Sequence, residues 1–447
     1  MMMSVAALNF VGRRRRVLPH VGRFFYARHF SLIKETKKKV IVGMSGGVDS
    51  SVAAFLLHQD KSLDVHGLYM NNWDSSDEEG QVTCPADMEY QAVRQVCDEI
   101  GISCSRVDFV QEYWNNVFSP CLDEYAQGFT PNPDVLCNRE IKFDAFAQHA
   151  KQLGADFIAT GHYAQLKPVA ASDGTSMLAL HAAVDTNKDQ SYFLSHVLGQ
   201  AFQQVIFPLG NLTKPQVRQI AADAGLHTAM KKESMGICFI GKRPFGSFLA
   251  QYVPPRRGHF VSVESGNVLH QHDGFSAYTI GQGAKYAGQP LKWFVVGKRD
   301  ADAAIFIAPG THHPSLFCDR AYVSATAFNW IVGQPETLQP GQSIRCQYRA
   351  RYRQPLADCT VSVVDAVDAS VLQQRPTASD DDKRASPPLF LHVEFDTPQR
   401  GIAPGQSLVL YRDDGLCFGG GAIHCAGPSY FEQNKPLPSP LPTDWSV

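Results

Sequence analysis

A short stretch near the start of the chain constrains the fold most strongly. The apolar run Lys39–Gly43 predicts a buried strand, and Val48–His58 predicts a helix with apolar residues at helical spacing. Between them lies Ser-Gly-Gly-Val-Asp-Ser (Ser45–Ser50), whose two glycines let backbone N–H groups converge on an anion at the positive end of the helix. This segment therefore predicts a phosphate-binding loop rather than a plain glycine turn. It lacks the lysine of the Gly-x4-Gly-Lys-Ser/Thr loop, which excludes the ordinary P-loop NTPases.

Composition limits the class of protein. The chain has 447 residues, enough for two or three domains. Hydrophobic residues make up 44% and charged residues 19% of it, the balance typical of a globular protein. The formal net charge of −2 gives no global signal for nucleic-acid binding, so any such binding must come from local patches. No apolar run is long enough to cross a bilayer, and we expect no membrane partner.

Residues 1–34 differ from the rest of the chain. They contain six arginines, and the first acidic residue is Glu35. An arginine-rich, acid-free leader with interspersed aromatic residues is typical of a mitochondrial transit peptide, and no long apolar block follows the charges as it would in a secretory signal. We therefore expect the protein in the mitochondrial matrix. A basic arm that contacts RNA is the alternative.

The eleven cysteines are too dilute for a disulfide scaffold, and their odd number leaves at least one unpaired. No Cys-x2-Cys pair occurs, so a structural zinc site has no local support. A reducing compartment with one or two working thiols fits this pattern better.

Strand and helix patterns alternate from residue 39 to about residue 200, which predicts an α/β domain with a parallel sheet covered on both faces. Ligands of such sheets bind beyond the carboxyl ends of the strands, so the glycine loop, Met70–Trp73 and Gly161–Tyr163 should converge there. The expected strands are Lys39–Gly43, Val65–Asn71, Ser103–Phe109 and Phe157–Thr160. The expected helices are Val48–His58, Ala86–Ile100, Glu112–Gln127 and Arg139–Leu153.

Glycines, prolines and short alternating runs dominate from about residue 245 onward, which predicts all-β structure. We expect a small β-rich connector over residues 242–313 and a C-terminal β-barrel over residues 314–430. Residues 377–388 are expected to form a solvated insertion between two barrel strands, and residues 431–447 a disordered tail.

Further motifs resemble one family in order along the chain. They are Gly67–Trp73, Thr130–Asn138, Ala159–Ala164, Lys188–Leu194, Phe207–Gly210 and Lys232–Gly241. Together with the glycine loop they resemble the tRNA-specific 2-thiouridylase family in its mitochondrial form, over residues 38–427. The resemblance implies an ATP-pyrophosphatase (adenine nucleotide alpha hydrolase-like) domain over residues 38–241. It also implies ATP-dependent 2-thiolation of the wobble uridine of a tRNA anticodon, with release of AMP and pyrophosphate.

The resemblance implies ATP and Mg²⁺ as cofactors. The glycine loop would hold the pyrophosphate, Met70 would pack on adenine unless it is a core methionine, and Gly161 would let the backbone approach the nucleotide. Asp49 is expected to hold Mg²⁺, because a carboxylate with phosphate oxygens suits this ion; capping of the following helix is the alternative. The loop residues implied in ATP binding are Gly43, Met44, Ser45, Gly46, Gly47, Val48, Asp49 and Ser50.

Two cysteines carry the sulfur chemistry that the resemblance implies. Cys238 would accept a sulfur atom as a persulfide from a sulfur-relay donor protein. Cys137 would then release hydrosulfide or close a Cys137–Cys238 disulfide. Because the thiolate is the reactive form, both should be partly exposed in a positive or helix-end environment. Cys137 lies just before the helix predicted from Arg139, and Lys231 and Lys232 lie near Cys238. We expect the other nine cysteines to be structural.

The resemblance sets Asn132, Pro133 and Asp134 against the target base, where Asn and Asp can pair with the edge of a flipped pyrimidine. Asp134 is the candidate for proton transfer during adenylation, although Asn-Pro-Asp is also an ordinary turn. The implied tRNA contacts are His162, Lys188, Asp189, Gln190, Arg351, Tyr352 and Gln406. A lone histidine such as His162 also fits a purely structural role.

Arginines around residue 351 alternate with tyrosines at period two. They should line one strand face as a surface for phosphates and stacked bases, unless this is only a solvated face. The arginines are Arg345, Arg349, Arg351 and Arg353. Gly283 departs from the family pattern, which often has a basic residue there.

Two other functions compete with tRNA thiolation. The first is a different ATP pyrophosphatase, such as a tRNA lysidine synthetase or an amide-forming synthetase, which needs no cysteine pair. The second is a non-catalytic RNA-binding or redox-sensing protein, which would form no AMP from ATP and tRNA.

Overall fold

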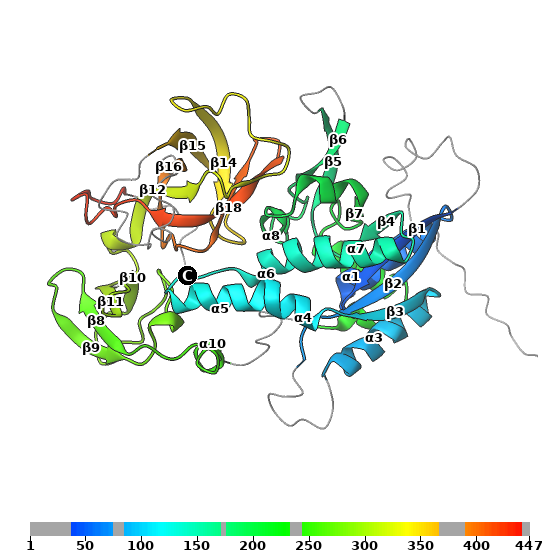
Figure 1. The fold of residues 1–447 in the computed structure, drawn as a ribbon, viewed down its shortest axis with the longest axis horizontal. Helices are drawn as coiled ribbons and strands as arrows, with labels where there is room; N and C mark the ends of the chain where they lie inside the picture. The colour runs from blue at the N-terminus through cyan, green and yellow to red at the C-terminus, as the bar shows by residue number, and fades with distance from the viewer. Residues whose placement is uncertain (1–36, 75–84, 171–175, 233–243, 366–388, 440–447) are drawn as a thin grey trace, which may run out of the picture. The chain divides into compact units, whose positions relative to one another are not determined.

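The predicted first strand lies at the centre of a parallel sheet. We analysed a computed structural model that describes residues 37–74, 85–170, 176–232, 244–365 and 389–439. Its first sheet has five strands in the order β3-β2-β1-β4-β7, and every neighbouring pair is parallel (Figure 1). These strands are β1 Lys38–Met44, β2 Leu63–Asn71, β3 Ser103–Asp108, β4 Phe157–Ala159 and β7 Val205–Ile206. The predicted parallel α/β sheet is confirmed.

Side chains of β1 alternate between two hydrophobic cores. Val40 and Val42 join a core with α1, α3 and α9, whereas Ile41 joins the core on the opposite face. This is the period-two geometry of a strand buried on both faces. The helices of the first face are α1 Val48–Gln59, α3 Pro85–Ile100 and α9 Lys214–Asp223.

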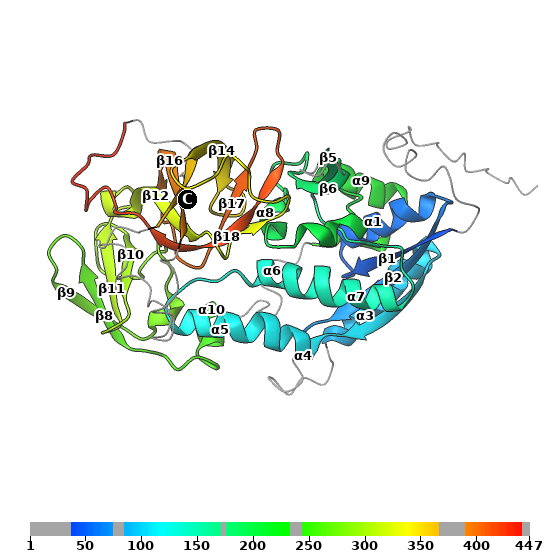
Figure 2. The same cartoon turned by 45° about the horizontal axis from the view of Figure 1, so that its top comes forward.

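Two long helical segments cover the other face and lie side by side in both ribbon views (Figure 2). The first runs from Val110 to Ala126 through α4 (Val110–Tyr113), the π-helical turn Trp114–Phe118 and α5 (Ser119–Ala126). The second runs from Pro133 to Gln152 through α6 (Pro133–Leu136), the π-helical segment Cys137–Ala145 and α7 (Phe146–Gln152). It begins six residues before the predicted Arg139, so that boundary was wrong.

The early start of the second helical segment has a local cause. Asn132 is its N-cap, and the side chain of Asn132 accepts a hydrogen bond of 3.2 Å from the Asp134 N–H. Pro133 occupies the first helical position and Asp134 the first turn. Each residue type is favoured at its position. Asn-Pro-Asp is thus a helix start rather than a free turn.

The C-terminal half is built from β-structure, as predicted. A four-stranded sheet has the order β10-β11-β8-β9, and six antiparallel strands close into a barrel through the β12–β18 pairing. The strands of the first are β8 Gly258–Ser262, β9 Val268–His272, β10 Trp293–Arg299 and β11 Ala304–Pro309. The barrel strands are β12 Phe317–Ser324, β14 Ser343–Arg349, β15 Ala357–Val364, β16 Phe390–Arg400, β17 Ser407–Tyr411 and β18 Cys417–Ala426, with β13 Asn329–Trp330 added to β18.

Smaller elements complete the described chain. β5 and β6 form an antiparallel hairpin. The predicted insertion 377–388 lies outside the described residues, but the strands on either side of it, β15 and β16, are paired neighbours. The remaining elements are β5 Gln165–Ala170, β6 Ser176–His181, α8 Ser191–Leu194, α10 Phe245–Leu249 and the single 3-10 turns Gly199–Gln204, His227–Met230, Phe275–Ala277 and Pro314–Leu316.

The sequence did not predict β18, because its Cys-Phe-Gly-Gly-Gly run resembles a loop. The glycines are required by close packing. A Cβ at Gly420 would lie 2.5 Å from Ser195 Oγ, and one at Gly421 would lie 2.6 Å from a methyl group of Val323. A side chain at either position would collide with its neighbour, so glycine is required at these two positions of the strand.

The predicted disordered tail does not hold for its first part. Residues 431–439 are described, and the Lys435 N–H donates a 2.8 Å hydrogen bond to the Tyr430 carbonyl. The Tyr430 N–H in turn donates to the Phe317 carbonyl at 2.9 Å. The chain therefore stays against β12 beyond residue 430.

None of the helices in the described ranges is both long and apolar enough to span a membrane.

A buried ion pair joins the barrel to the α/β domain. Arg349 of β14 donates to the Asp189 carboxylate, and their side chains are 6% and 1% exposed. Asp189 also accepts from the N–H groups of Ala183 (3.0 Å) and Ser191 (3.1 Å). Nearby, the Tyr192 hydroxyl donates to the Ser407 carbonyl at 3.0 Å. The turn before α8 is thus fixed by contacts with the barrel.

We predict that Arg349→Met lowers the free energy of unfolding by roughly 3–5 kcal/mol, because it leaves the Asp189 carboxylate buried without its cation. Urea denaturation followed by tryptophan fluorescence measures the change. Adding Asp189→Asn should recover part of the loss. The matched control is Arg345→Met, which removes an exposed pair with Asp396 and should not move the urea midpoint measurably. An equal effect of both variants would contradict the stabilising role given to the buried Arg349–Asp189 pair.

Candidate active site

The glycine loop joins the carboxyl end of β1 to the start of α1. Gly47 is the N-cap of α1 and has no side chain to cap the first turn, while Gly46 adopts φ +67°, a conformation that favours glycine. The side chains of Met44 and Val48 are buried in the core, so these residues can meet a ligand only through their backbone. Ser45 is exposed, and its N–H donates to Ser50 Oγ at 3.2 Å. The loop therefore has the position at a helix start that was predicted for it, and its binding of phosphate stays a prediction.

Asp49 lies in the first turn of α1 and does not cap it. Its carboxylate accepts from the Tyr163 hydroxyl at 2.7 Å and from Lys214 Nζ at 2.8 Å to each oxygen. The capping alternative is thus wrong. Tyr163 follows β4 and Lys214 begins α9, so residues far apart in the sequence meet at this carboxylate.

The geometry of Asp49 fits a Mg²⁺ ion that is carried on phosphates. A carboxylate offers about four lone-pair sites, and the donors on Asp49 use three of them, two on Oδ1 and one on Oδ2. No group of three His, Cys, Asp or Glu side chains able to hold a metal occurs among the described residues. Mg²⁺ is commonly held by one or two carboxylates with substrate phosphates, which matches a single acid at the loop.

Met70 and Gly161 lie beside the loop, as predicted. Met70 is half-buried near the end of β2, and a Cβ at Gly43 would lie 3.3 Å from Met70 Cε. A Cβ at Gly161 would lie 2.7 Å from the Ser50 backbone nitrogen. Only glycine allows the chain after β4 to approach α1 this closely. The three segments therefore converge at the carboxyl edge of the sheet.

Two lysines at the loop escaped sequence analysis. Besides Lys214, Lys231 donates from Nζ to the Gly46 carbonyl at 2.9 Å. Both lie more than 160 residues after the loop in the sequence. The one feature of the sequence that could have indicated them is the absence of a lysine within the loop, which leaves a cation to be supplied from elsewhere in the chain.

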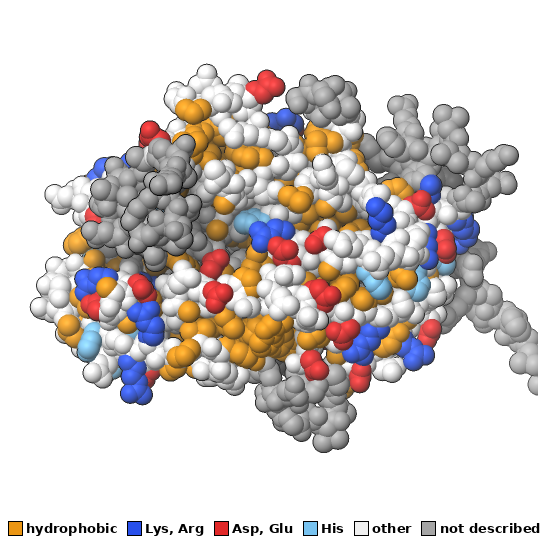
Figure 3. Space-filling view, in the orientation of Figure 1, with side chains coloured by type: hydrophobic (Ala, Val, Ile, Leu, Met, Phe, Trp, Pro, Cys, Tyr) orange, Lys and Arg blue, Asp and Glu red, His pale blue; other side chains and the backbone are white. Residues whose placement is uncertain are grey.

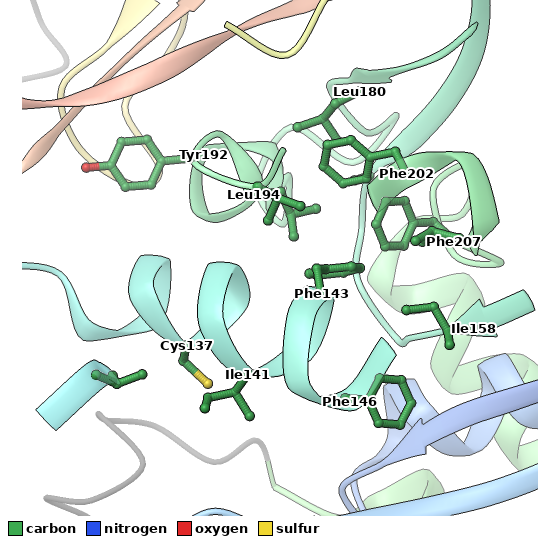
Figure 4. Close-up of a cluster of buried hydrophobic side chains, with 14 of the residues drawn as sticks. Cys137, Ile141, Phe143, Phe146, Ile158, Leu180, Tyr192, Leu194, Phe202 and Phe207 are labelled. Atoms are coloured by element: carbon green, nitrogen blue, oxygen red, sulfur yellow. The ribbon is translucent and has the colours of Figure 1, made fainter. Parts of the chain in front are cut away.

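Cys137 lies inside the protein rather than at its surface. It is 4% exposed, and Figure 4 shows it on the same helix as Ile141, with Tyr192 and Leu194 on the opposite segment. It comes one turn after the helix start at Pro133. The predictions of partial exposure and of a position before the helix are therefore wrong for Cys137. Cys238 lies outside the described residues, so the proximity of the two cysteines is not tested.

Asp134 has an environment suited to proton transfer. Burial raises the pKa of its carboxyl above the ordinary value, and the charge of Lys142 partly opposes this shift. Asp134 lies three residues before Cys137, in the first turn of the same helix.

Predicted tRNA contacts from the barrel gather around the segment that contains these residues. Gln406 Nε2 donates to the Thr130 carbonyl at 2.6 Å, and the Thr130 N–H donates to the Pro404 carbonyl at 3.0 Å. The ring of Tyr352 lies 4.5 Å from that of Phe193. Asn138, next to Cys137, donates to the Phe193 carbonyl at 3.2 Å. The Thr130–Asn138 motif and the barrel are thus neighbours.

Other predicted tRNA contacts are structural. His162 is 8% exposed, packs against Phe143 and Phe207, and bonds to Thr160 Oγ1 at 2.8 Å. Burial lowers its pKa well below the usual value, with a smaller contribution from Lys142, so it carries no charge at neutral pH. The structural alternative for His162 is correct.

Two residues of the turn Lys188–Gln190 make contacts inside the protein. Asp189 is buried in the ion pair with Arg349, so it is not an RNA contact. Gln190 accepts from the Tyr163 N–H at 2.9 Å and donates its own N–H to the Tyr163 carbonyl at 2.8 Å. The half-buried Lys188 remains a predicted tRNA contact.

The predicted arginine face does not form. β14 ends at Arg349, which is buried, so Arg351 and Arg353 lie in the following turn rather than on the strand. Arg345 is exposed and pairs with Asp396 at 2.7 Å. Arg351 donates to the Arg400 carbonyl. A Cβ at Gly283 would meet no atom within 4 Å, so the space for a side chain exists there.

Nine cysteines fall within the described ranges, and none of these nine forms a disulfide there. Of the eight expected to be structural, all but Cys104 are buried. Burial raises the pKa of the Cys121 and Cys318 thiols to about 12. These thiols are protonated at neutral pH, which agrees with a structural role.

Hydrophobic side chains also gather on the face shown in Figure 3, over α5 and toward α10. Trp114 at the start of this region is 42% exposed and stacks on Trp73 with the ring centroids 5.8 Å apart. Nothing in the sequence motifs predicted this surface.

Three family models match the chain in succession. The model described as "tRNA methyl transferase HUP domain" matches residues 38–242. "tRNA methyl transferase PRC-barrel domain" matches residues 246–309, and "Aminomethyltransferase beta-barrel domain" matches residues 384–423. These matches follow the order of the parallel sheet, the four-stranded sheet and the barrel.

Curated relatives match over nearly their whole length. The chain is 43% identical to the tRNA-specific 2-thiouridylase MnmA of Protochlamydia amoebophila, over 91% of this chain and 99% of the relative. Identity to the enzymes of the same name is 45% for Halalkalibacterium halodurans and 45% for Alkaliphilus oremlandii, which cover 86% of this chain and 94% and 96% of the relatives. The chain therefore belongs to the tRNA-specific 2-thiouridylase family.

Proposed function

We propose that the protein is a tRNA-uridine 2-sulfurtransferase that uses ATP to replace O2 of the wobble uridine by sulfur. One observation carries the proposal. A glycine loop at the start of α1 and a cysteine that follows an Asn-Pro-Asp helix start occur in one chain whose family members bear the 2-thiouridylase name. The first feature suits the splitting of ATP, and the second suits sulfur transfer to a base.

In the first step, uridine O2 attacks the α-phosphorus of ATP, so that an O2–AMP bond forms and pyrophosphate leaves. The loop Gly43–Ser50 would bind the pyrophosphate group through backbone N–H groups. Asp49 would hold a Mg²⁺ ion, which would supply positive charge against the phosphates. Asn132 and Pro133 would lie against the base, and Asp134 would accept the proton that the uridine ring loses.

In the second step, sulfur replaces the adenylate. A sulfur-relay donor protein would load Cys238 as a persulfide, and the terminal sulfur would attack C2 while AMP leaves. Cys137 would then attack Cys238 Sγ. The bond between Cys238 Sγ and the sulfur atom now attached to C2 would break, so that 2-thiouridine leaves and a Cys137–Cys238 disulfide forms. A thiol reductant must return two electrons in each cycle. Since Cys137 is 4% exposed, this attack requires the thiol to be uncovered.

The central experiment supplies the chain with unmodified tRNA, ATP, Mg²⁺, a persulfidated sulfur-relay protein as the sulfur donor and a thiol reductant. Nucleosides are analysed by mass spectrometry, and AMP and pyrophosphate are quantified. We expect 2-thiouridine, AMP and pyrophosphate in equal amounts. In a parallel reaction that also contains lysine, AMP formation with lysidine in place of 2-thiouridine would favour a lysidine synthetase. A lack of AMP would favour a non-catalytic RNA-binding protein.

Serine at either cysteine should lower 2-thiouridine formation about 100-fold or more, because a serine hydroxyl neither ionises at neutral pH nor carries a persulfide. The variants are Cys137→Ser and Cys238→Ser. Pyrophosphate release should persist, since adenylation precedes sulfur transfer. Cys104→Ser, at a partly exposed cysteine outside the motifs, is the matched control and should keep the wild-type rate. Full activity of Cys137→Ser would eliminate the thiol mechanism.

Asp134→Asn should abolish adenylation without loss of stability. The pKa of Asp134 is raised in the fold, so its ionised form disfavours the folded state at neutral pH, and this cost disappears as the pH falls through the folded pKa. Asp134→Asn should therefore be at least as stable as wild type at pH 7, with a difference that shrinks on acidification. Thermal unfolding and AMP formation across pH measure the two effects. Wild-type adenylation by Asp134→Asn would remove its assigned role.

We also propose that residues 1–34 direct the protein to the mitochondrial matrix. The six arginines and the absence of acidic residues before Glu35 support this assignment. A fluorescent protein that carries these residues should co-localise with a matrix marker. Replacing the six arginines by glutamine should abolish import. Uptake that does not depend on the arginines would count against a transit peptide.

A further inference from the structure

The glycine loop contains no lysine, yet two lysine ammonium groups lie on it. Lys214 Nζ contacts both oxygens of Asp49 at 2.8 Å, and Lys231 Nζ contacts the Gly46 carbonyl at 2.9 Å. Asp49 and Gly46 are both residues of the loop that was predicted to bind phosphate. The loop therefore has cations on two sides, supplied by the chain after β7.

The start of α9 fixes Lys214. Thr213 and Gln216 form a capping box, and the Lys214 N–H donates to the Asp185 carboxylate at 2.8 Å. Lys214 is 8% exposed, a degree of burial that lysine reaches only with a charged partner. Its ammonium also lies 5.8 Å from the centre of the Tyr163 ring, the residue that shares Asp49. The position of this charge is thus determined by backbone and side-chain contacts together.

The same helix positions Lys231. Arg218, one turn after Lys214, donates to the Ala229 carbonyl at 2.8 Å and to the Lys231 carbonyl at 3.3 Å. These bonds hold the backbone of Lys231 while its side chain extends over Gly46. Lysine has three N–H donors, and the Gly46 carbonyl takes one of them. The exposed position of Lys231 leaves its ammonium accessible to a ligand at the loop.

We propose that Lys214 and Lys231 bind the pyrophosphate moiety of ATP and the pyrophosphate that is released from it. They would replace the lysine that a P-loop carries within its own motif. Lys214 would be shared between Asp49 and a phosphate oxygen, and Lys231 would contact the phosphates from the Gly46 side. The inference rests on the proposed function in that it takes ATP as the nucleotide of this loop.

Isothermal titration calorimetry on the full chain tests the inference directly, with Mg-ATP and Mg-pyrophosphate as separate probes. Lys214→Gln and Lys231→Gln should each raise the Kd of both probes about tenfold, the size of one charge-assisted hydrogen bond. Lys214→Arg should retain most of the affinity. Lys232→Gln, at the adjacent exposed lysine, is the matched control and should leave both Kd values unchanged. In the thiolation assay, the KM for ATP should rise more than kcat falls.

Thermal unfolding of each variant identifies any loss of folding. Because Lys214 is buried beside Asp49, Lys231→Gln at the exposed position provides the measurement that does not depend on core stability. Wild-type Kd values for both probes in Lys231→Gln and in folded Lys214→Gln would overturn the inference. If the wild-type chain binds pyrophosphate through these lysines but forms no 2-thiouridine, the proposed function fails and the lysine site stands. If 2-thiouridine forms with an unchanged KM for ATP in both variants, the proposed function stands and the lysine site fails.

Discussion

The Asp49 carboxylate is the junction on which the geometry of the site depends. It lies in the first turn of α1 and accepts hydrogen bonds from Tyr163 and Lys214. Tyr163 is in turn bonded through its backbone to Gln190, and the adjacent Asp189 pairs with Arg349 of the barrel. One network of charged and polar groups thus connects the glycine loop to the barrel. Within the fold, each member is either partly or fully removed from water, so loss of one partner leaves another unsatisfied.

A second constraint is the burial of Cys137. Its helix packs between the parallel sheet and the segment that carries Tyr192 and Leu194, and this packing leaves 4% of the residue exposed. Reactive cysteines are usually partly exposed, so the proposed attack by Cys137 requires that its thiol be uncovered first. The surrounding contacts from Gln406 and Tyr352 come from the barrel, so the barrel is close enough to influence access to this helix.

The sequence predicted strands and helices best where periodicity was strong. The β1 strand and helix α1 agree with prediction within one residue at all four of their ends. β18 was missed because three glycines conceal a strand whose lack of side chains is explained only by neighbours such as Ser195 and Val323. The start of the Pro133–Gln152 helix was missed although Asn132 and Pro133 carry a recognisable capping signal.

The candidate site residues also divide into those that were placed correctly from a local pattern and those that were not. The convergence of Gly46, Gly161 and Met70 at one edge of the sheet was predicted correctly, because a glycine loop and the ends of parallel strands have local signatures. His162, Asp189 and Arg349 were misassigned, since an alternating or isolated polar residue has the same appearance in sequence whether it faces solvent or the core. Burial decides between these outcomes, and burial depends on elements that lie far away along the chain.

The sequence by itself determined the parallel sheet, the place of the glycine loop between β1 and α1 and the order of the three β-containing regions, because these follow from local periodicity and glycine placement. Only the tertiary structure decided where the cations of the loop come from and which polar groups are buried. Lys214 and Lys231 reach the loop through the packing of α9 and the segment after it, and Arg349 reaches Asp189 through closure of the barrel. Such pairings join residues more than 150 positions apart, and no local pattern specifies them.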